Sequence, residues 1–82
     1  MATLIYRAHL ERLTGKREER IEAARVSDAI AHIRQTYGKQ ASKDAQRMFI
    51  TVNRKILDRQ TMFNTPLRDG DVVSFLPIAG GG

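Results

Sequence analysis

Few side chains in this sequence combine the types and spacing that catalysis or metal binding requires. None of the 82 residues is a cysteine, which excludes disulfides, thiolate metal sites and cysteine nucleophiles. The two histidines, His9 and His32, are far apart and lack metal-ligand spacing, and Ser27 has no base near it in the sequence. The remaining reactive group is the carboxylate that ends the run Gly80-Gly81-Gly82. We therefore predict no catalytic site built from side chains, no metal site and no bound cofactor.

The glycine run has two interpretations. Three consecutive glycines have no side chains to bury and great backbone freedom, so residues 78–82 are expected to form a flexible tail. Such an ending can be a frayed terminus or a cloning remnant. It can also be a functional segment that enters a narrow channel, where a Cβ atom would clash with the walls. The elements that precede the run have to decide between these interpretations.

The preceding residues, 1–77, predict one small α+β domain. A chain of this length forms a single core, and no repeat or linker divides it. Apolar alternation and runs of strand-forming residues predict five strands, of which the second has the weaker pattern and the fourth is short. In chain order these strands are residues 2–10, 20–25, 48–52, 56–57 and 72–76. Polar segments separate them, and turns are predicted at 53–55 and at Asp69-Gly70-Asp71.

One helix is predicted between the second and third strands. Ser27 is the candidate N-cap, and Asp28 follows in the first turn, where the helix dipole favours a negative charge. Gly38 would end the helix in a left-handed conformation. An apolar stripe at helical spacing would face the sheet: Ala29, Ile30, Ile33 and Tyr37. The polar segment 39–46 is expected to be a loop with at most one helical turn.

Composition limits the function classes further. No apolar run approaches the roughly 20 residues needed to cross a bilayer, and the first residues lack a secretory signal. We therefore expect a cytoplasmic protein without a membrane partner. The net charge of +5 suits nucleic acid or an acidic protein, but acidic residues lie among the basic ones. The few aromatic residues form no stacking motif of RNA binders, so nucleic acid is not the favoured partner.

The element order and several short motifs resemble the MoaD/ThiS family of β-grasp sulfur carriers. The turn Asp69-Gly70-Asp71 precedes the last strand, and Phe75-Leu76-Pro77 precedes the glycine terminus. Tyr6-Arg7-Ala8, Leu13-Thr14-Gly15 and Val52-Asn53 are most similar to the small subunit of molybdopterin synthase. The resemblance covers essentially the whole chain. It implies a ubiquitin-like fold with a mixed four- to five-stranded sheet packed on one main helix.

The resemblance also implies a reaction for the tail. An E1-like adenylating enzyme would use ATP to convert the Gly82 carboxylate into an acyl-adenylate. A sulfur donor would then displace AMP and leave a thiocarboxylate. An accepting enzyme, such as the large subunit of molybdopterin synthase, would take this sulfur for molybdenum cofactor biosynthesis. Ile78 replaces a proline that is frequent in that branch, and an alignment on Ile78 would make Gly81 the modified end and Gly82 extra.

In this interpretation the chain is a carrier or non-catalytic small subunit that docks on its partner enzymes. Partner contacts are expected at the base of the tail and along it, from Phe75, Pro77, Ile78, Ala79, Gly80 and Gly81. Alternation places Phe75 on the same sheet face as Val73, so Phe75 can equally be a core residue, whereas Ile78 lies beyond the strand.

Three other functions stay open. The same tail could carry sulfur for thiamine or another sulfur-containing metabolite. It could form an isopeptide bond with a lysine, as ubiquitin-like modifiers do. A lower-ranked alternative is a β-grasp module that binds RNA through its basic surface, and such a module would not need Gly81 and Gly82.

Overall fold

Five strands form one mixed sheet that holds the last strand at its centre. The computed structural model describes residues 1–78, so the predictions for Ala79, Gly80, Gly81 and Gly82 lie outside the described residues. The strands are β1 (Ala2–Tyr6), β2 (Glu18–Ile21), β3 (Phe49–Val52), β4 (Lys55–Ile56) and β5 (Val72–Leu76), and their order across the sheet is β2-β1-β5-β3-β4. β5 pairs in parallel with β1 and antiparallel with β3. The mixed sheet and the β-grasp fold that the sequence predicts are confirmed.

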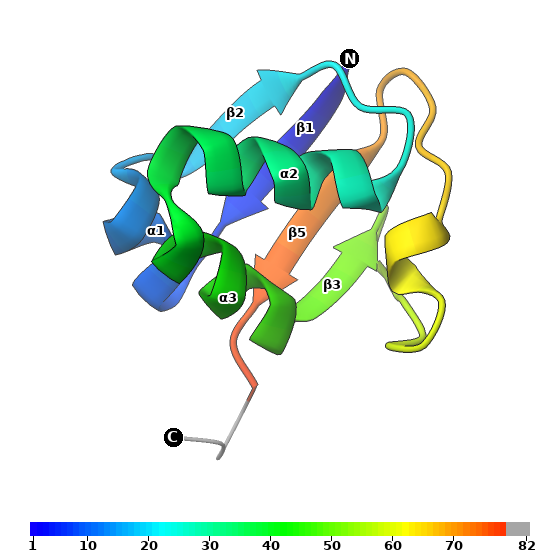
Figure 1. Cartoon of the computed structure of the whole chain (residues 1–82). Helices are drawn as coiled ribbons and strands as arrows, with labels where there is room; N and C mark the ends of the chain where they lie inside the picture. Colours follow the sequence, from blue (N-terminus) through cyan, green and yellow to red (C-terminus); the bar gives the residue numbers. More distant parts are fainter. Residues whose placement is uncertain (79–82) are drawn as a thin grey trace.

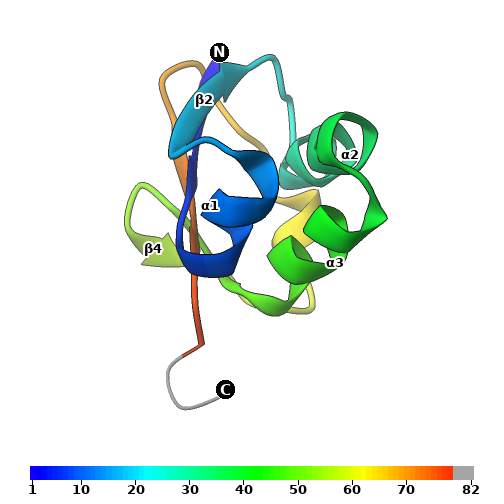
Figure 2. The ribbon, with the colours of Figure 1, turned by 90° about the vertical axis from the view of Figure 1, so that its left-hand side faces the viewer.

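The helices that cover the sheet lie on one of its faces (Figures 1 and 2). They are α1 (Ala8–Thr14), α2 (Val26–Tyr37), α3 (Lys39–Arg47) and the short 3-10 helix η1 (Met62–Asn64). Figure 2 shows the sheet nearly edge-on, with α2 and α3 on the same side. Among residues 1–78, no helix has the length and apolarity that a membrane span requires. Within residues 1–78, no helix covers the opposite face of the sheet.

The core lies between the sheet and the helices. Leu4, Tyr6, Val73 and Phe75 point from the two central strands into this layer and are completely buried. From the helices, Val26, Ala29 and Ile33 of α2 and Ala41 and Ala45 of α3 complete the core. The predicted stripe on α2 is confirmed, because Ile30 and Tyr37 also pack against this cluster. Because β5 packs against the core and pairs with a strand on each side, the position of its C-terminal end is held relative to the rest of the domain.

The predicted strand over residues 2–10 is wrong beyond Tyr6. The chain turns at Ala8, which has a positive φ of 52°, and continues as α1 to Thr14. Leu10 extends the apolar alternation of β1 and is also the buried residue of a helix, so a short apolar pattern fits both structures. The second strand was expected at 20–25, but β2 spans Glu18–Ile21, because Ile21 pairs with Ala2 at the end of the ladder.

The expected loop at residues 39–46 is also wrong, because this segment forms α3. Its buried residues are small (Ala41, Ser42 and Ala45), which lets α3 approach α2 closely although the segment is polar overall. The sheet therefore packs on two adjacent helices, not on one main helix alone. Polar composition misled the prediction because Lys, Gln and Ala are good helix formers that also occur in loops.

The start of α2 differs in detail from the prediction. The helix begins at Val26, so Ser27 is inside it and is not the N-cap. Arg25 is the N-cap residue, and Asp28 in the first turn holds the chain before the helix, because its Oδ2 accepts hydrogen bonds from the backbone amides of Ala24 (2.9 Å) and Arg25 (3.0 Å). Gly38 does end α2, but its φ of 100° and ψ of 173° lie outside the left-handed helical region.

Candidate functional site

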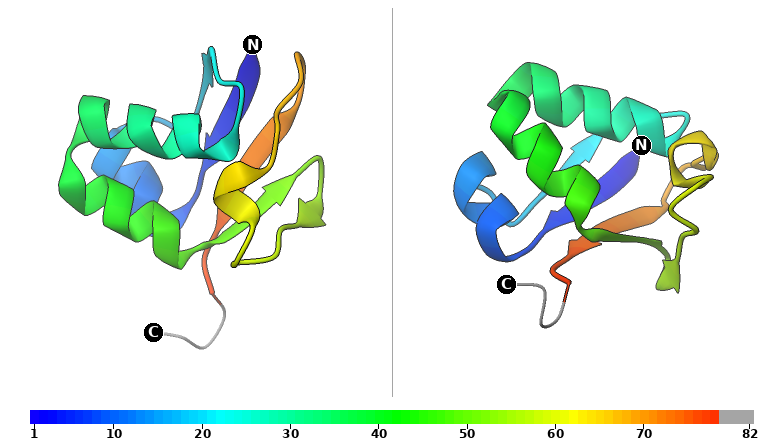
Figure 3. Two further views of the ribbon diagram at one scale, coloured as in Figure 1. Left: turned by 45° about the vertical axis from the view of Figure 1, so that its right-hand side comes forward. Right: turned by 60° about the horizontal axis from the view of Figure 1, so that its bottom comes forward.

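The chain leaves the sheet at the end of β5, at a point that its neighbours hold firmly. Phe75 pairs with Tyr6 of β1, and Leu76 pairs with Phe49 of β3. Pro77, which has no amide hydrogen to continue the ladder, follows directly. Both views of Figure 3 show the chain leaving the sheet at the C-terminal end of β5. We call Pro77 and Ile78 the root of the tail, and the paired end of β5 fixes where this root begins.

The predicted partner contacts fall into three groups. Pro77 and Ile78 are exposed at the root, with 43% of Ile78 accessible to solvent. Phe75 is completely buried, and its ring lies 5.9 Å from that of Tyr6, which matches the core position that the alternation also allowed. Its predicted contact with a partner stays a prediction. The predicted contacts Ala79, Gly80 and Gly81, and the reactive Gly82, lie outside the described residues.

A partly apolar surface lies beside the root, on the face of the sheet that no described helix covers. We call it the open face, and its apolar residues are Ile5, Phe49, Ile56, Val72 and Leu76. Phe49 is 37% exposed and lies opposite Leu76, next to the point where the chain leaves. Ile56 is 67% exposed on the edge strand. The alternation in Phe49-Ile50-Thr51-Val52 was the available signal, because it places the exposed Phe49 and the buried Ile50 on opposite faces of the sheet.

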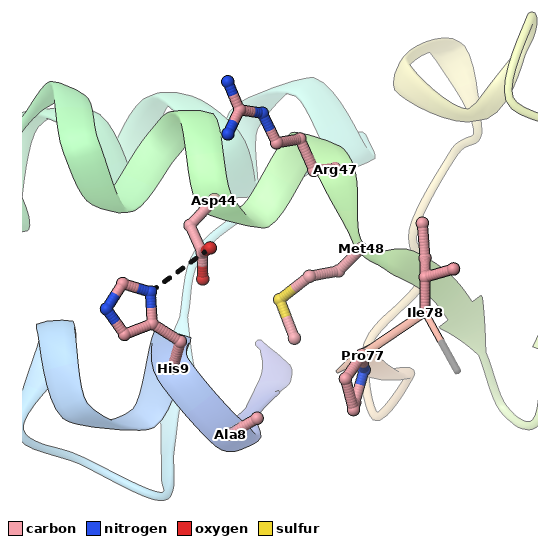
Figure 4. Close-up of a pocket in the computed structure, with 7 residues that line it drawn as sticks. All are labelled: Ala8, His9, Asp44, Arg47, Met48, Pro77 and Ile78. Atoms are coloured by element: carbon pink, nitrogen blue, oxygen red, sulfur yellow. Dashed lines mark hydrogen bonds and ion pairs between the residues drawn. The ribbon is translucent and has the colours of Figure 1, made fainter. Parts of the chain in front are cut away.

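On its helical side the root borders a hollow of about 560 Å³ (Figure 4). Residues from α1, α3 and the root line it: Ala8, His9, Asp44, Arg47, Met48, Pro77 and Ile78. His9 Nδ1 lies 3.4 Å from Asp44 Oδ1, and the Arg47 guanidinium points away from this pair. His9 is largely exposed, and the lining includes no hydroxyl or thiol nucleophile for it to activate. The hollow can therefore receive a partner side chain, but its lining does not make a catalytic site.

The most perturbed titratable groups lie elsewhere, between β2 and α2. Glu19 Oε2 accepts hydrogen bonds from the hydroxyls of Tyr6 (2.5 Å) and Tyr37 (2.8 Å) and lies 3.1 Å from His32 Nε2. Burial alone would raise the pKa of Glu19, but the three hydrogen bonds and the charge of His32 bring it below the usual value. Burial, followed by the Glu19 contact, raises the pKa of Tyr37 to about 12. This cluster ties β1, β2 and α2 together, so its role is structural.

Replacing Glu19 with glutamine should make the fold less stable at neutral pH than in acid, relative to the unchanged chain. Because the folded pKa of Glu19 is lowered, its carboxylate contributes stability above the unfolded pKa of about 4.3, and this contribution is lost as the pH falls through the folded pKa. We expect Glu19→Gln to cost about 1–2 kcal/mol near pH 7 and less below about pH 4. Urea unfolding at both pH values measures this difference.

The neighbouring exposed residue Glu18 provides the control for this prediction. Glu18→Gln removes the same charge without touching the tyrosines, and it should change stability by less than about 0.5 kcal/mol at either pH. An equal cost of Glu19→Gln at both pH values would show that the charge of the carboxylate does not stabilise the cluster.

Comparisons with known proteins agree with this geometry. The model of the ThiS family matches residues 4–82. The chain is similar to a putative molybdopterin converting factor, subunit 1, from Pyrococcus furiosus, with 28% identity over 93% of this chain and 94% of the other, and a TM-score of 0.73. It is similar to a chain in the complex of subunits 1 and 2 of the molybdopterin-converting factor from Helicobacter pylori, with 26% identity over 99% and 97% and a TM-score of 0.70.

A third solved structure shares the fold at lower identity. It is the small archaeal modifier protein 1 (SAMP1) from Methanosarcina acetivorans, with 20% identity over 99% of this chain and 95% of the other, and a TM-score of 0.82. A comparison with curated protein sequences finds no match. These three similar structures therefore include molybdopterin-converting-factor subunits and a modifier protein, and they share one architecture.

Proposed function

We propose a function from the premise that this chain belongs to the ThiS family, whose relatives are sulfur carriers and ubiquitin-like modifiers. In this proposal the chain carries sulfur as a thiocarboxylate on Gly82 and delivers it in molybdopterin biosynthesis. The observation that supports it most is the exposed root at Pro77 and Ile78, which follows directly on a central strand paired on both sides. The chain acts as a carrier or non-catalytic small subunit, and the partner enzymes supply the catalytic groups.

The proposed reaction needs two steps at the terminal carboxylate. In the first, a carboxylate oxygen of Gly82 attacks the α-phosphorus of ATP on an E1-like adenylating enzyme, and pyrophosphate leaves. In the second, a hydrosulfide sulfur attacks the acyl carbon, and AMP leaves. The product is a thiocarboxylate, a soft nucleophile that transfers its sulfur to a bound acceptor on a second enzyme, and hydrolysis restores the carboxylate. ATP is thus a substrate of the activating enzyme and no cofactor of this chain.

Glycines at the end suit such a transfer. The carboxylate has to enter an active site, and side chains on the last residues would narrow the conformations and channels that allow this. Residues 79–82, if extended, reach at most about 14 Å beyond Ile78. A docking surface next to the root is therefore needed, and the open face and the hollow at His9 and Asp44 lie on either side of it.

The molybdopterin pathway is favoured over the alternatives by sequence identity. The two solved relatives described as converting-factor subunits are 28% and 26% identical over nearly their whole length. The Helicobacter pylori protein is a complex of two subunits, which supports an accepting enzyme as a partner of this chain. The modifier SAMP1 is 20% identical and supports the fold alone. Sulfur transfer to thiamine or another metabolite uses the same chemistry and differs only in the acceptor.

Mass spectrometry of the intact chain tests the proposal. The chain is incubated with ATP, sulfide and the adenylating enzyme of its own host, and replacement of oxygen by sulfur adds about 16 Da. Fragmentation should place the added mass on Gly82, and the same added mass at the end of a chain that has lost Gly82 would identify Gly81 as the alternative end. No added mass, although the enzyme forms the adenylate, would overturn sulfur carriage. Lysine-linked adducts in host extracts would instead show a modifier.

A further inference from the structure

The hairpin between β3 and β4 contains a residue in an unfavourable backbone conformation. Thr51 pairs with Ile56 and Val52 with Lys55, so the loop consists of Asn53 and Arg54 alone. Both have positive φ angles, 51° and 75°. Two-residue loops of this kind favour Asn followed by Gly, because a Cβ atom destabilises left-handed backbone. Asn53 fits this preference, but an arginine at position 54 makes the hairpin less stable than glycine would.

Arg54 is one of the residues that line a hollow on the open face. The hollow has a volume of about 500 Å³ and is lined by Ile5, Arg7, Asn53, Arg54, Val72 and Ser74. Its floor is formed by central-strand residues, of which Ile5 and Val72 are apolar. Two arginines therefore line a hollow whose floor is partly apolar, on the same face that carries Phe49 and Leu76 at the root of the tail.

The charges around this hollow leave both arginines available. Among residues 1–78, neither Arg7 nor Arg54 lies within ion-pair distance of a carboxylate. Asp71, the acidic residue next to the hairpin, already accepts hydrogen bonds from Asn53 Nδ2 (2.9 Å) and from the Arg68 amide (2.8 Å). Glu18 lies on the same face opposite Ile5, on the edge strand β2. The hollow is thus a positively charged site with an apolar base.

We propose that Arg7 and Arg54 bind a carboxylate-bearing segment of the adenylating enzyme, and that Arg54 occupies its unfavourable position for this recognition. The proposal rests on the proposed function. An acidic side chain of the enzyme would pair with the guanidinium groups, while a neighbouring apolar side chain would fill the space above Ile5 and Val72.

The adenylating enzyme is the appropriate partner for two reasons. Sulfur carriage and lysine conjugation both begin with activation of the carboxylate, so this enzyme has to bind the chain under either function. The hollow and the root also share one face, so an enzyme that holds the tail covers both. Nucleic acid fits the site less well, because the floor has no aromatic side chain on which a base could stack.

Substitutions at Arg54 separate binding from backbone strain. Arg54→Lys keeps the charge, Arg54→Gln removes the charge but keeps a Cβ, and Arg54→Gly removes both. The KM of the host adenylating enzyme for this chain, measured by ATP–pyrophosphate exchange, should follow the charge. We expect the double variant Arg7→Gln/Arg54→Gln to raise KM about 10-fold at about 50 mM NaCl and about 2-fold at 0.5 M, with kcat nearly unchanged.

The thermal unfolding midpoint of the same variants should instead depend on whether residue 54, at its positive φ, carries a Cβ atom. Arg54→Gly should raise the unfolding midpoint by about 3–5 °C, whereas Arg54→Gln should leave it within about 1 °C. The control Arg12→Gln/Lys43→Gln also removes two positive charges, from exposed positions on α1 and α3, and should change KM less than 2-fold by the same electrostatic argument.

The outcomes distinguish the inference from the proposed function. If the unchanged chain is not adenylated, the proposed function fails and the inference fails with it. If it is adenylated and the arginine double variant keeps the same KM, only the inference fails. An equal rise in KM for the control pair would show that binding depends on the net charge of the chain and not on a specific site, which would overturn the inference. Tight binding of a single-stranded RNA 12-mer that the double variant loses would assign the two arginines to nucleic acid.

Discussion

Deletion of Gly81 and Gly82 should abolish adenylation and leave the stability of the domain unchanged. Every core residue of the described structure lies between Ala2 and Phe75, so the deletion removes none of the packing found there. It moves the carboxylate back by up to about 7 Å along an extended chain. Misplacement of a reacting group by about 1 Å can already cost about 100-fold in rate, so we expect at least this loss in ATP–pyrophosphate exchange.

A series of tail lengths makes this prediction sharper. Deletion of Gly82 alone distinguishes the two candidate ends, because full activity in that variant would make Gly81 the reactive residue. Gly82→Ala keeps the length and adds one Cβ, and it should lower the rate if the end enters a narrow channel. Urea unfolding of each variant verifies the fold. A truncated chain that is adenylated and supports its pathway in the host would contradict the proposed function.

Those parts of the fold with unambiguous local signals could be predicted from the sequence. β5 occupies the predicted range 72–76, and the turn before it is present, with a backbone hydrogen bond from Asp71 to Arg68. The apolar run at 48–52 forms β3, and Asn53 takes the positive φ expected at a tight turn. These segments combine strand-forming residues with turn residues on both sides, so only one local structure satisfies the pattern.

The errors arose where a pattern fits two structures or where distant residues decide. Leu10 satisfies both an extended β1 and a helix α1, and Ala41 and Ala45 look like loop residues until α2 packs against them. The Glu19 cluster joins residues that are 13 and 18 positions apart, so no local window contains it. The root of the site followed from the sequence because it is the end of β5. The full extent of the open face did not, because the contribution of Phe49 and Ile56 depends on which strands are neighbours.

Phe75 and Phe49 should respond in opposite ways to replacement by alanine, although both are aromatic residues on adjacent strands. Phe75 is completely buried on the central strand against Tyr6, and Phe75→Ala should leave a cavity that costs about 3–5 kcal/mol. Small domains have a total stability of about 5–15 kcal/mol, so a large part of this domain's stability should be lost. Phe49 is 37% exposed, and Phe49→Ala should cost less than about 1 kcal/mol.

For the folded fraction of each variant, Phe49→Ala should weaken partner binding more than Phe75→Ala. Phe49 borders the root of the tail, so Phe49→Ala removes an apolar contact that a docked enzyme would bury, and we expect KM for adenylation to rise about 5-fold. Phe75→Ala should lose activity only in proportion to its unfolded fraction, which urea titration and circular dichroism at the assay temperature measure. A folded Phe75→Ala variant with a raised KM would mean that this ring reaches the partner after all, and the separation between the buried and open faces of the sheet would have to be redrawn.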